Sequence, residues 1–321
     1  MRALWFDGKK LGLKEMPVPR PAKNEALIKI LYAGICNTDL EIFKGYMKFK
    51  GVPGHEFTGV VEQGPKNWLG KRVVGEINLA CGKCGYCCAG MKRHCPYRTV
   101  LGIANKNGAF AEYLTLPHEN LHQVPASVPD LDAVFVEPLA AACRVLEQVK
   151  IKRGQKVYVL GDGKLGQLIA RVVKLKTPGL LLVGKHAQKL AIAKKQGIKT
   201  MLASKLSKID PGQKPDLVIE TTGNQSGFET ALEICRPLGT IVLKSTFSVN
   251  PEVNLSKIVV DEMKIIGSRC GNFPKAIELL ARNKVDLSGL LSGVFSLEDF
   301  EQAFNKATST NALKVVFKCM K

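Results

Sequence analysis

The sequence predicts an α/β protein in which a doubly wound parallel sheet is joined to a second, β-rich region. Three observations support this class. From about residue 140 onward, short apolar strands alternate with helical patterns, which is typical of a parallel sheet covered by helices. Residues 1–130 instead contain short apolar runs broken by glycine and proline, which is typical of β structure. The chain has 321 residues, enough for about two domains.

The individual elements follow from these patterns. Apolar or alternating runs predict strands at residues 26–31, 60–63 and 72–76 of the β-rich region. In the alternating region, residues 157–160 form a compact apolar strand, and residues 165–176 carry apolar side chains at helical spacing. The same reasoning predicts further strands at residues 180–183, 216–220, 240–243, 264–266 and 313–317, and helices at residues 187–196 and 228–235.

The composition narrows the class of protein. Hydrophobic residues make up 45% and charged residues 23% of the chain, as in an ordinary soluble globular protein. No stretch approaches the ~18 consecutive apolar residues of a membrane-spanning helix. The first ten residues contain an acid and lysines where a secretory signal needs an apolar run. We therefore expect a soluble, cytoplasmic protein without a membrane partner.

The net charge is unusual. Lysine and arginine total 47 against 28 acidic residues, a formal charge of +19, which makes nucleic acid the first hypothesis for a partner. The lysines are spread along the chain without a long basic run, and aromatic residues make up only 7%. A nucleic-acid site needs clustered basic residues or interleaved aromatic ones. Nucleic-acid binding is therefore not favoured, and a nucleic-acid-binding zinc protein is kept as an alternative.

A glycine-rich motif lies between a predicted strand and a predicted helix. Its six residues are Gly161, Asp162, Gly163, Lys164, Leu165 and Gly166. In a G-x-G-x-x-G loop, the first glycine allows a tight turn, the second lets a pyrophosphate approach the backbone, and the third permits close helix packing. The motif therefore predicts a dinucleotide site.

The next predicted strand indicates which dinucleotide binds. About 20 residues after the loop, an NAD site places an acidic residue on the adenosine ribose 2′-hydroxyl. Here the strand runs into Gly184, Lys185 and His186, with no carboxylate in this stretch. Glycine leaves room, and the two basic side chains can meet the charges of a 2′-phosphate. This predicts NADP(H) over NAD(H); the alternative is a basic surface pair that does not discriminate.

Five of the ten cysteines lie between Cys81 and Cys95. In a cytosolic chain, such bunching indicates a metal site rather than disulfides. The four thiolates of Cys81, Cys84, Cys87 and Cys95 can close a tetrahedral Zn²⁺ shell without an open position, which is a structural site. Cys88 adjoins Cys87, and the spacing alone does not choose between these two.

A third set of residues offers a different ligand chemistry. Cys36, His55 and Glu56 supply a thiolate, an imidazole and a carboxylate, the donor set of an open catalytic zinc. Glu137 is a carboxylate in an otherwise apolar segment. Because a buried carboxylate is costly unless it pairs or binds metal, we expect Glu137 to act near the same ion.

With these motifs in this order, essentially the whole chain resembles the zinc-dependent medium-chain dehydrogenase superfamily, which includes alcohol, sorbitol and threonine dehydrogenases. The resemblance implies a GroES-like catalytic domain formed by residues 1–138 and 270–321. It also implies an inserted Rossmann domain at residues 139–269, with the active site between the two. Residues 136–140 and 268–270 are more similar to the polyol and threonine branch, because the alcohol branch has cysteine at the position of Glu137.

The resemblance also implies roles for the metal residues. Cys36, His55 and Glu56 correspond to catalytic-zinc residues, and Glu137 to an acidic residue that ligates zinc directly or through water. The structural zinc corresponds to the four cysteines that include Cys87 rather than Cys88, so two zinc ions per chain are expected.

Three further residues correspond to positions around the substrate and the cofactor. Thr38 matches the Ser/Thr that passes the substrate proton. Glu41 stands where the family often has a histidine that hands this proton to solvent, and a carboxylate can accept it. Arg269 matches a basic residue near the cofactor in the polyol branch.

The resemblance thus implies a zinc-dependent alcohol dehydrogenase or carbonyl reductase. It would transfer hydride between NADP(H) and a small secondary alcohol, a polyol or the matching aldehyde or ketone. The family usually assembles through the edge strand of the cofactor domain, so a homodimer or homotetramer is expected. A zinc-independent quinone or enoyl reductase of the same fold is the nearest alternative, although it should lack the zinc residues. A sensor without turnover is disfavoured by the intact catalytic set.

Overall fold

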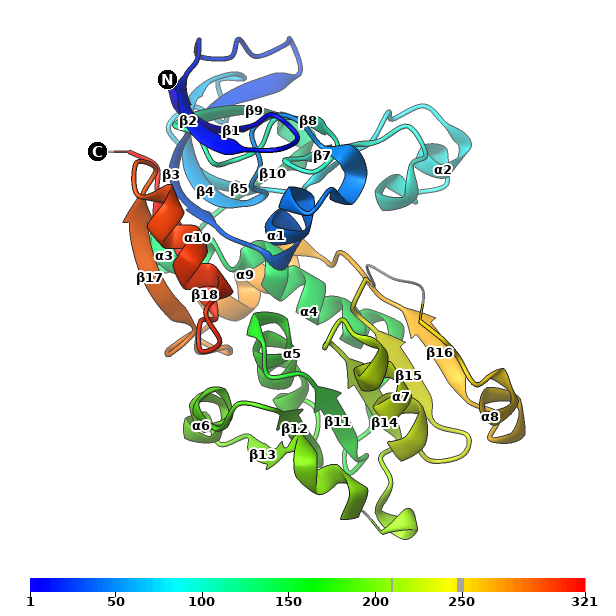
Figure 1. Ribbon diagram of the computed structural model, residues 1–321. Coiled ribbons are helices and arrows are strands. Elements are labelled where there is room, and N and C mark those ends of the chain that lie inside the picture. The colour runs from blue at the N-terminus through cyan, green and yellow to red at the C-terminus, as the bar shows by residue number, and fades with distance from the viewer. Residues whose placement is uncertain (209, 247–250, 321) are drawn as a thin grey trace. The chain divides into compact units, whose positions relative to one another are not determined.

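The computed structural model describes residues 1–208, 210–246 and 251–320 (Figure 1). The chain forms two compact units. We call Met1–Glu137 with Phe273–Lys321 the terminal unit, and Pro138–Asn272 the inserted unit. Within the described residues, no helix has both the length and the apolar character needed to cross a bilayer.

The inserted unit is built on a six-stranded sheet in which every neighbouring pair is parallel. Its strand order is β13-β12-β11-β14-β15-β16, so the chain begins in the middle, fills one side and then crosses to the other. The strands are β11 (Val157–Leu160), β12 (Leu180–Gly184), β13 (Lys199–Leu202), β14 (Leu217–Glu220), β15 (Thr240–Leu243) and β16 (Lys264–Gly267). This confirms the doubly wound Rossmann-type sheet, whose ligand site lies where the strand order reverses.

Helices and short turns connect these strands. They are α4 (Val136–Gln148), α5 (Lys164–Lys174), α6 (Ala187–Lys195), η4 (Ala203–Lys208), η5 (Pro211–Gln213), α7 (Gln225–Ile234) and α8 (Leu255–Val260). In α5, the apolar residues Leu168, Ile169, Val172 and Val173 are all buried, as their spacing predicts. The helix ends at Lys174, two residues earlier than predicted.

The terminal unit contains a seven-stranded sheet with the order β10-β5-β4-β3-β18-β17, in which β9 also pairs with β3. Two smaller sheets, β1-β2 and β6-β7-β8, complete it. The strands are β1 (Arg2–Phe6), β2 (Leu11–Glu15), β3 (Glu25–Gly34), β4 (Glu56–Gln63), β5 (Arg72–Gly75), β6 (Asn78–Leu79), β7 (Thr99–Leu101), β8 (Asn105–Lys106), β9 (Tyr113–Pro117), β10 (Leu121–Gln123), β17 (Leu291–Ser296) and β18 (Lys314–Lys318).

The two distant parts of the chain meet within this sheet. Strand β18 pairs antiparallel with β3, and Val316 lies opposite Gly34. Strand β4 flanks β3 on its other side and begins at Glu56, four residues earlier than predicted, because the pairing continues to Gly34. The expectation that both chain ends build one β-rich domain is therefore confirmed.

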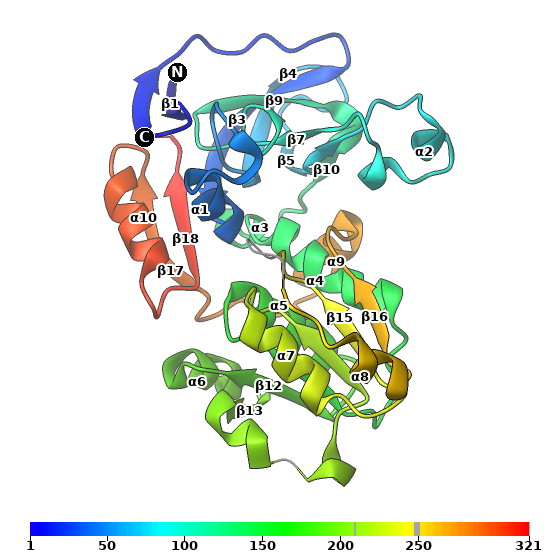
Figure 2. The same cartoon turned by 45° about the vertical axis from the view of Figure 1, so that its right-hand side comes forward.

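The helices and turns of the terminal unit are short. They are α1 (Asn37–Phe43), η1 (Tyr46–Lys48), α2 (Gly85–Cys88), η2 (Lys92–His94), η3 (His118–Asn120), α3 (Asp130–Ala133), α9 (Phe273–Ala281) and α10 (Phe300–Thr308). Helix α10 lies along β17 and β18, as Figure 2 shows. Its Phe304 packs edge-on against Phe43 of α1, with ring centroids 5.0 Å apart, which ties α1 to the C-terminal segment.

Candidate metal centres and cofactor site

Cys36, His55 and Glu56 meet where β3 and β4 lie side by side. Cys36 follows β3 and is the N-cap of α1, whereas Glu56 is the first residue of β4. One ligand atom from each of the three residues lies within 4.8 Å of the others. His55 and Glu56 are buried and Cys36 is half-buried. The fold therefore brings together three possible metal ligands that are up to 20 positions apart in the chain.

Asp39, which the sequence reasoning did not single out, organises this centre. It is fully buried in the first turn of α1. Its carboxylate accepts hydrogen bonds from the backbone N–H of Cys36 (2.7 Å) and of Gly54 (3.2 Å). Its Oδ1 also lies 3.4 Å from Nδ1 of His55, within ion-pair distance but outside hydrogen-bond geometry. Nδ1 thus faces the carboxylate, and Nε2 is left for a metal.

The charges around His55 favour its protonated ring when no metal is bound. Burial on its own would lower the pKa of His55, but the Asp39 carboxylate and the Cys36 sulfur outweigh burial and raise this pKa well above its usual range. A bound metal would displace the proton from one ring nitrogen while Asp39 holds the other. A site with these charges suits a divalent cation.

Glu56 has a buried counter-ion, which is a second feature that the sequence reasoning missed. Its Oε2 forms an ion pair with Nζ of Lys314 on β18, and both side chains are at most 1% exposed. Lys314 Nζ also lies 3.5 Å from the backbone oxygen of Ile35, to which it donates. The Glu56 carboxylate is therefore close enough to Cys36 and His55 to bind the same metal ion, and Lys314 balances its charge.

The remaining residues expected around the catalytic zinc differ in their placement. Thr38 Oγ1 lies 3.7 Å from Cys36 Sγ. Glu41 forms an ion pair of 3.0 Å with Lys44 on the surface of the same turn. Glu137 is half-buried in the first turn of α4, and its carboxylate does not belong to the three-residue group found among the described residues.

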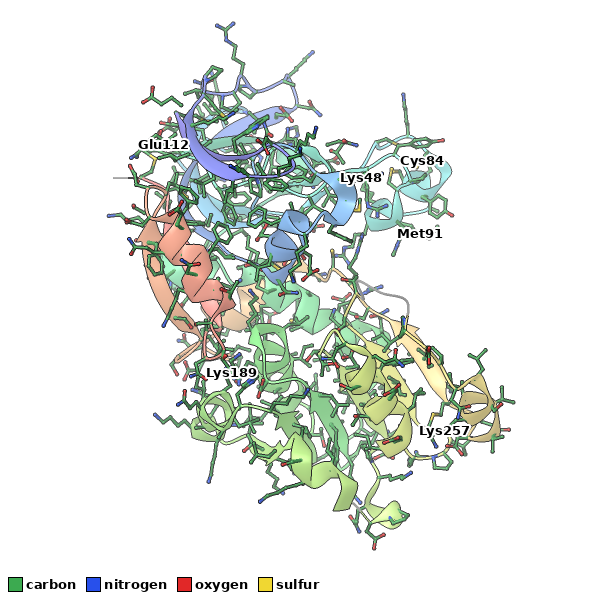
Figure 3. All side chains as sticks on the ribbon, viewed as in Figure 1. Lys48, Cys84, Met91, Glu112, Lys189 and Lys257 are labelled. Carbon is green, nitrogen blue, oxygen red and sulfur yellow. The ribbon has the colours of Figure 1, made fainter. Side chains whose placement is uncertain are left out.

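The four predicted cysteines form a second group, in the lobe around α2 where Figure 3 labels Cys84. Cys84 Sγ lies 3.5 Å from Cys87 Sγ and 3.7 Å from Cys95 Sγ, and Cys81 Sγ lies 3.9 Å from Cys87 Sγ. These sulfur separations match the edges of a tetrahedron around one zinc ion, because Zn–S bonds are about 2.3 Å. The neighbouring Cys88 is exposed and directs its thiol to the Lys83 carbonyl, 3.8 Å away.

Two of the four thiols have shifted pKa values. The backbone N–H of Lys83, and to a smaller extent that of Cys84, lowers the pKa of Cys81 to about 6. Burial, with the hydrogen bond between Cys84 and Cys87, raises the pKa of Cys87 to about 12. The lowered pKa of Cys81 favours its thiolate, the form that binds a metal, and a metal ion would release the proton of Cys87 on binding.

In the inserted unit, the glycine loop joins β11 to α5 as predicted. Gly161 has φ of +112°, which favours glycine. A Cβ on Gly166 would lie 1.9 Å from the Gly161 carbonyl oxygen, whereas a Cβ on Gly163 would meet nothing within 4 Å. Gly163 is the N-cap of α5, followed by Lys164 and Leu165. The loop thus has a tightly packed side and an open side where a pyrophosphate can approach the helix N-terminus.

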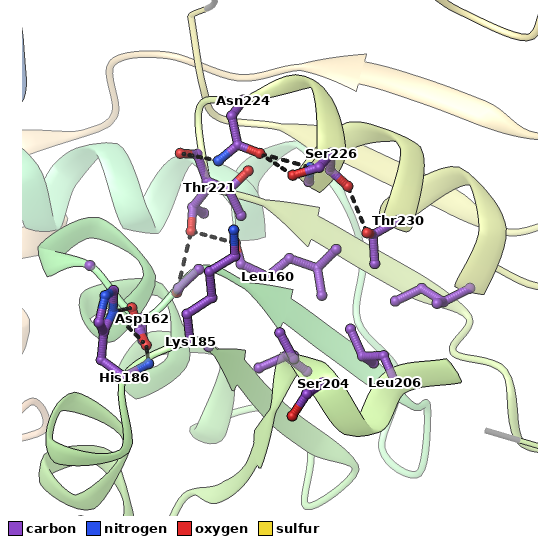
Figure 4. A pocket seen from close by; sticks show the side chains of 18 of the residues that line it. Leu160, Asp162, Lys185, His186, Ser204, Leu206, Thr221, Asn224, Ser226 and Thr230 are labelled. Carbon is purple, nitrogen blue, oxygen red and sulfur yellow. Dashed lines mark hydrogen bonds and ion pairs between the residues drawn. The ribbon is translucent and has the colours of Figure 1, made fainter. Parts of the chain in front are cut away.

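A cavity of about 530 Å³ opens beside this loop (Figure 4). It is lined by residues at the carboxyl ends of β11, β12 and β14, among them Gly184, Lys185, His186 and Thr221. Both its place in the sheet and its size suit the adenosine half of a dinucleotide. Lys185 is exposed, and the His186 side chain is about one-third exposed.

One finding adds to the sequence reasoning, which considered only the carboxylates of the strand end itself. Asp162, the second residue of the glycine loop, places its side chain directly against Gly184. Its Oδ2 accepts a hydrogen bond from the backbone N–H of His186 (2.7 Å), and its Oδ1 lies 2.9 Å from His186 Nδ1. The sequence reasoning searched only downstream of the strand and so overlooked an acid supplied by the preceding loop.

Arg269 lies in the segment after β16 and is exposed. It is not among the described residues that line the 530 Å³ cavity. Its backbone carbonyl accepts a hydrogen bond of 2.8 Å from Lys244 Nζ, which also donates to the Ala141 carbonyl (2.8 Å). Lys244 therefore ties the segment that carries Arg269 to β15 and α4.

Comparison with known proteins is consistent with this architecture. Residues 22–126 match the family "Alcohol dehydrogenase GroES-like domain", and residues 165–282 match "Zinc-binding dehydrogenase". A sorbitol dehydrogenase from Halalkalibacterium halodurans is 30% identical, over 95% of this chain and 94% of its own length. A D-arabitol-phosphate dehydrogenase from Enterococcus avium is 31% identical, over 96% of this chain and 94% of its own length.

The fold is shared with solved structures as well. The short chain alcohol dehydrogenase rspB of E. coli CFT073, complexed with NADH, has a TM-score of 0.91 and 27% identity, and the match covers 99% of both chains. Together with full-length relatives that are dehydrogenases of alcohols and polyols, these matches place the chain in the zinc-dependent medium-chain dehydrogenase superfamily, as an oxidoreductase.

Proposed function

We propose that the protein is a zinc-dependent alcohol dehydrogenase or carbonyl reductase that uses NADP(H). Its substrate class would be a small secondary alcohol, a polyol or the matching aldehyde or ketone. The observation that carries this proposal is the convergence of Cys36, His55 and Glu56 within 4.8 Å at a largely buried point. The sorbitol and arabitol-phosphate dehydrogenases among the relatives support a polyol-like substrate.

The donor set fits a catalytic zinc, because it combines a thiolate, an imidazole and a carboxylate and leaves a position open for substrate. When bound, Zn²⁺ would act as a Lewis acid on the substrate oxygen. Cys36, His55 and Glu56 would hold the ion, Asp39 keeps the imidazole oriented, and Lys314 pairs with Glu56. Glu137 is proposed as a further ligand, directly or through water.

The proton released from an alcohol would leave through the chain's own side chains. Thr38 lies next to the Cys36 sulfur and carries a hydroxyl that can accept one proton and donate another. Glu41 follows one helical turn later, and its carboxylate, which pairs with Lys44 at 3.0 Å, lies at the surface where a proton can pass to water. We therefore propose Thr38 as the first step of the relay and Glu41 as its exit.

The second proposed zinc is structural. Cys81, Cys84, Cys87 and Cys95 would fill its coordination shell completely, so it offers no place for a substrate. The sulfur separations of 3.5–3.9 Å support this assignment. Two zinc ions per chain are the result, and a reducing compartment such as the cytoplasm is proposed because these thiols must stay unoxidised.

The NADP(H) preference rests on the basic residues at the end of β12. Gly161, Gly163 and Gly166, with Lys164 and Leu165, would hold the pyrophosphate, and Lys185 and His186 would face the 2′-phosphate beside Gly184. Arg269 is proposed as a cation for the rest of the cofactor. Because the E. coli rspB structure contains NADH, the preference needs a direct test. Fluorescence titrations with NADPH and NADH should give tighter NADPH binding; equal affinities would contradict it.

Variants of the proposed zinc ligands test the dehydrogenase activity, because turnover and NADPH affinity can be measured separately in them. Cys36→Ala and His55→Ala should abolish turnover of alcohols or ketones while leaving NADPH affinity nearly unchanged. Cys88→Ala is the matched control, because Cys88 is exposed and lies outside both metal groups of the described residues. Full turnover by Cys36→Ala would refute the proposed active site.

We also propose a homodimer or homotetramer formed through β16. This strand is the last of its sheet, and its outer edge is not paired within the described residues. Beside it α8 exposes Val259 (74%) and Val260 (79%), and Leu238 and Ile265 add further exposed apolar surface. Such a patch marks an association surface. Light scattering should give a multiple of 35.0 kDa, and Val259→Asp with Val260→Asp should give monomers.

A further inference from the structure

We propose that Asp162 is a positioning residue for His186, and that this pair recognises the 2′-phosphate of NADP(H). The inference rests on the proposed cofactor preference and adds a specificity-determining residue to it. Figure 4 shows the two side chains together at one side of the cavity.

Asp162 occupies the place of a side chain that β12 lacks. A Cβ built on Gly184 would lie 2.3 Å from Asp162 Oδ2, 2.4 Å from its Cβ and 2.5 Å from its Cγ. Dinucleotide folds that bind NAD place an acidic side chain at this strand end, directed at the ribose 2′-hydroxyl. In this chain, glycine at position 184 makes room for an acid that comes from the loop instead.

Asp162 lines the cavity, and its carboxylate contacts His186. Its Oδ2 accepts from the His186 backbone N–H at 2.7 Å, and its two oxygens lie 2.9 and 3.2 Å from His186 Nδ1. The Asp162 side chain is 7% exposed, whereas that of His186 is 35% exposed. The histidine is therefore the more accessible of the two, and because its Nδ1 faces Asp162, Nε2 is the ring nitrogen left for a ligand.

The Asp162 carboxylate would repel a phosphate that it faced directly, but here it contacts His186, which can donate a hydrogen bond to the phosphate. A carboxylate on Nδ1 fixes the orientation of the ring, and between this carboxylate and a bound phosphate the ring can carry two protons, donating Nδ1–H to Asp162 and Nε2–H to a phosphate oxygen. Two further charged groups lie at this corner: Lys185, which is exposed, and Lys189, which is buried in α6. Burial lowers the pKa of Lys189, and the Asp162 carboxylate opposes this shift. His186 is also the N-cap of α6, and a helix N-terminus favours an anion.

A double-mutant cycle tests the role of Asp162. The quantity measured is the ratio of the dissociation constant for NADH to that for NADPH, from fluorescence titrations of the purified full-length protein. Asp162→Asn keeps the volume and an acceptor for the His186 N–H but removes the charge. We expect Asp162→Asn and His186→Ala each to lower the ratio about tenfold, the effect of losing one charge-assisted hydrogen bond. The double variant should lower it no further.

Other outcomes would overturn the inference in recognisable ways. A higher ratio in Asp162→Asn would mean that the carboxylate repels the phosphate. An equal loss of affinity for both cofactors would mean that Asp162 only supports the loop. Additive effects in the double variant would remove the link to His186. Asp216→Asn, at the opposite end of β14, is the control and should leave the ratio unchanged. A wild-type ratio near one would instead overturn the NADP(H) preference itself.

Discussion

Replacing Lys314 with methionine would leave Glu56 as a buried carboxylate without its counter-ion. Both side chains are at most 1% exposed, so water cannot take over the role of the lysine. Methionine retains the apolar stem, and the loss is therefore electrostatic. Breaking a buried ion pair by removing one partner costs about 3–5 kcal/mol, and we expect Lys314→Met to lower the free energy of unfolding by that amount.

The two tryptophans provide the assay. Trp5 and Trp68 both belong to the terminal unit, so their fluorescence during urea unfolding reports on this unit. Lys318→Met is the matched control: Lys318 ends the same strand but is exposed, and its loss should change stability by at most about 0.5 kcal/mol. Adding Glu56→Gln to Lys314→Met removes both charges and should recover most of the loss.

The reasoning fails if Lys314→Met unfolds within about 1 kcal/mol of the wild type, which is the scale of an exposed pair. It also fails if Lys318→Met is equally destabilising, because the effect would then belong to the strand and not to the buried charge.

Three more predictions follow from the same structure. Gly166→Ala should weaken both cofactor binding and thermal stability, because its Cβ would lie 1.9 Å from a backbone oxygen. Gly163→Ala has open space around its Cβ and should weaken cofactor binding alone. Calorimetry measures the stability and NADPH titration the binding of each variant, and equal effects of the two substitutions would contradict this prediction. Cys95→Ala should lower the zinc content measured by mass spectrometry from two ions to one, and Cys88→Ala should leave it at two. Burial would raise the pKa of Asp216, but hydrogen bonds from an arginine and a backbone N–H outweigh it and hold this pKa below its usual value. Asp216→Asn should therefore lower the melting temperature at pH 7. The gap should narrow as pH falls below about 4, where the carboxyl of the unfolded chain protonates first, and close once the folded carboxyl protonates as well. A gap that does not narrow below about pH 4 would refute this.

Elements with a strong local pattern could be predicted from the sequence. Residues 157–160 form β11 as expected, because a buried central parallel strand is continuously apolar. Strands β13 and β17 were not predicted, since β13 lies at a sheet edge and neither strand is mostly buried. Their residues therefore carry no clear apolar alternation.

The residues of the candidate site could also be predicted from the sequence only in part. Residue types and short spacings selected Cys81, Cys84 and Cys95 but left Cys87 and Cys88 open, and the family resemblance chose Cys87. Residue types selected Cys36, His55 and Glu56, which the structure brings together. Lys314 could not be paired with Glu56, because 258 positions separate them and a lysine within an apolar strand looks like an edge residue. Asp39 had a weak signal in its position three residues after the N-cap of α1.

The distance along the chain between Glu56 and Lys314 has a consequence for biosynthesis. Lys314 is made 258 residues after Glu56, a delay of about 13–52 s at translation rates of roughly 5–20 residues per second. During this time the whole inserted unit is synthesised and can fold, while the β3 edge that later receives β18 is still unpaired. Unpaired edges and uncompensated buried charges favour aggregation and unfolding. Nascent chains stalled before β18 should therefore depend on chaperones, even though the inserted unit with its glycine loop is already synthesised in them.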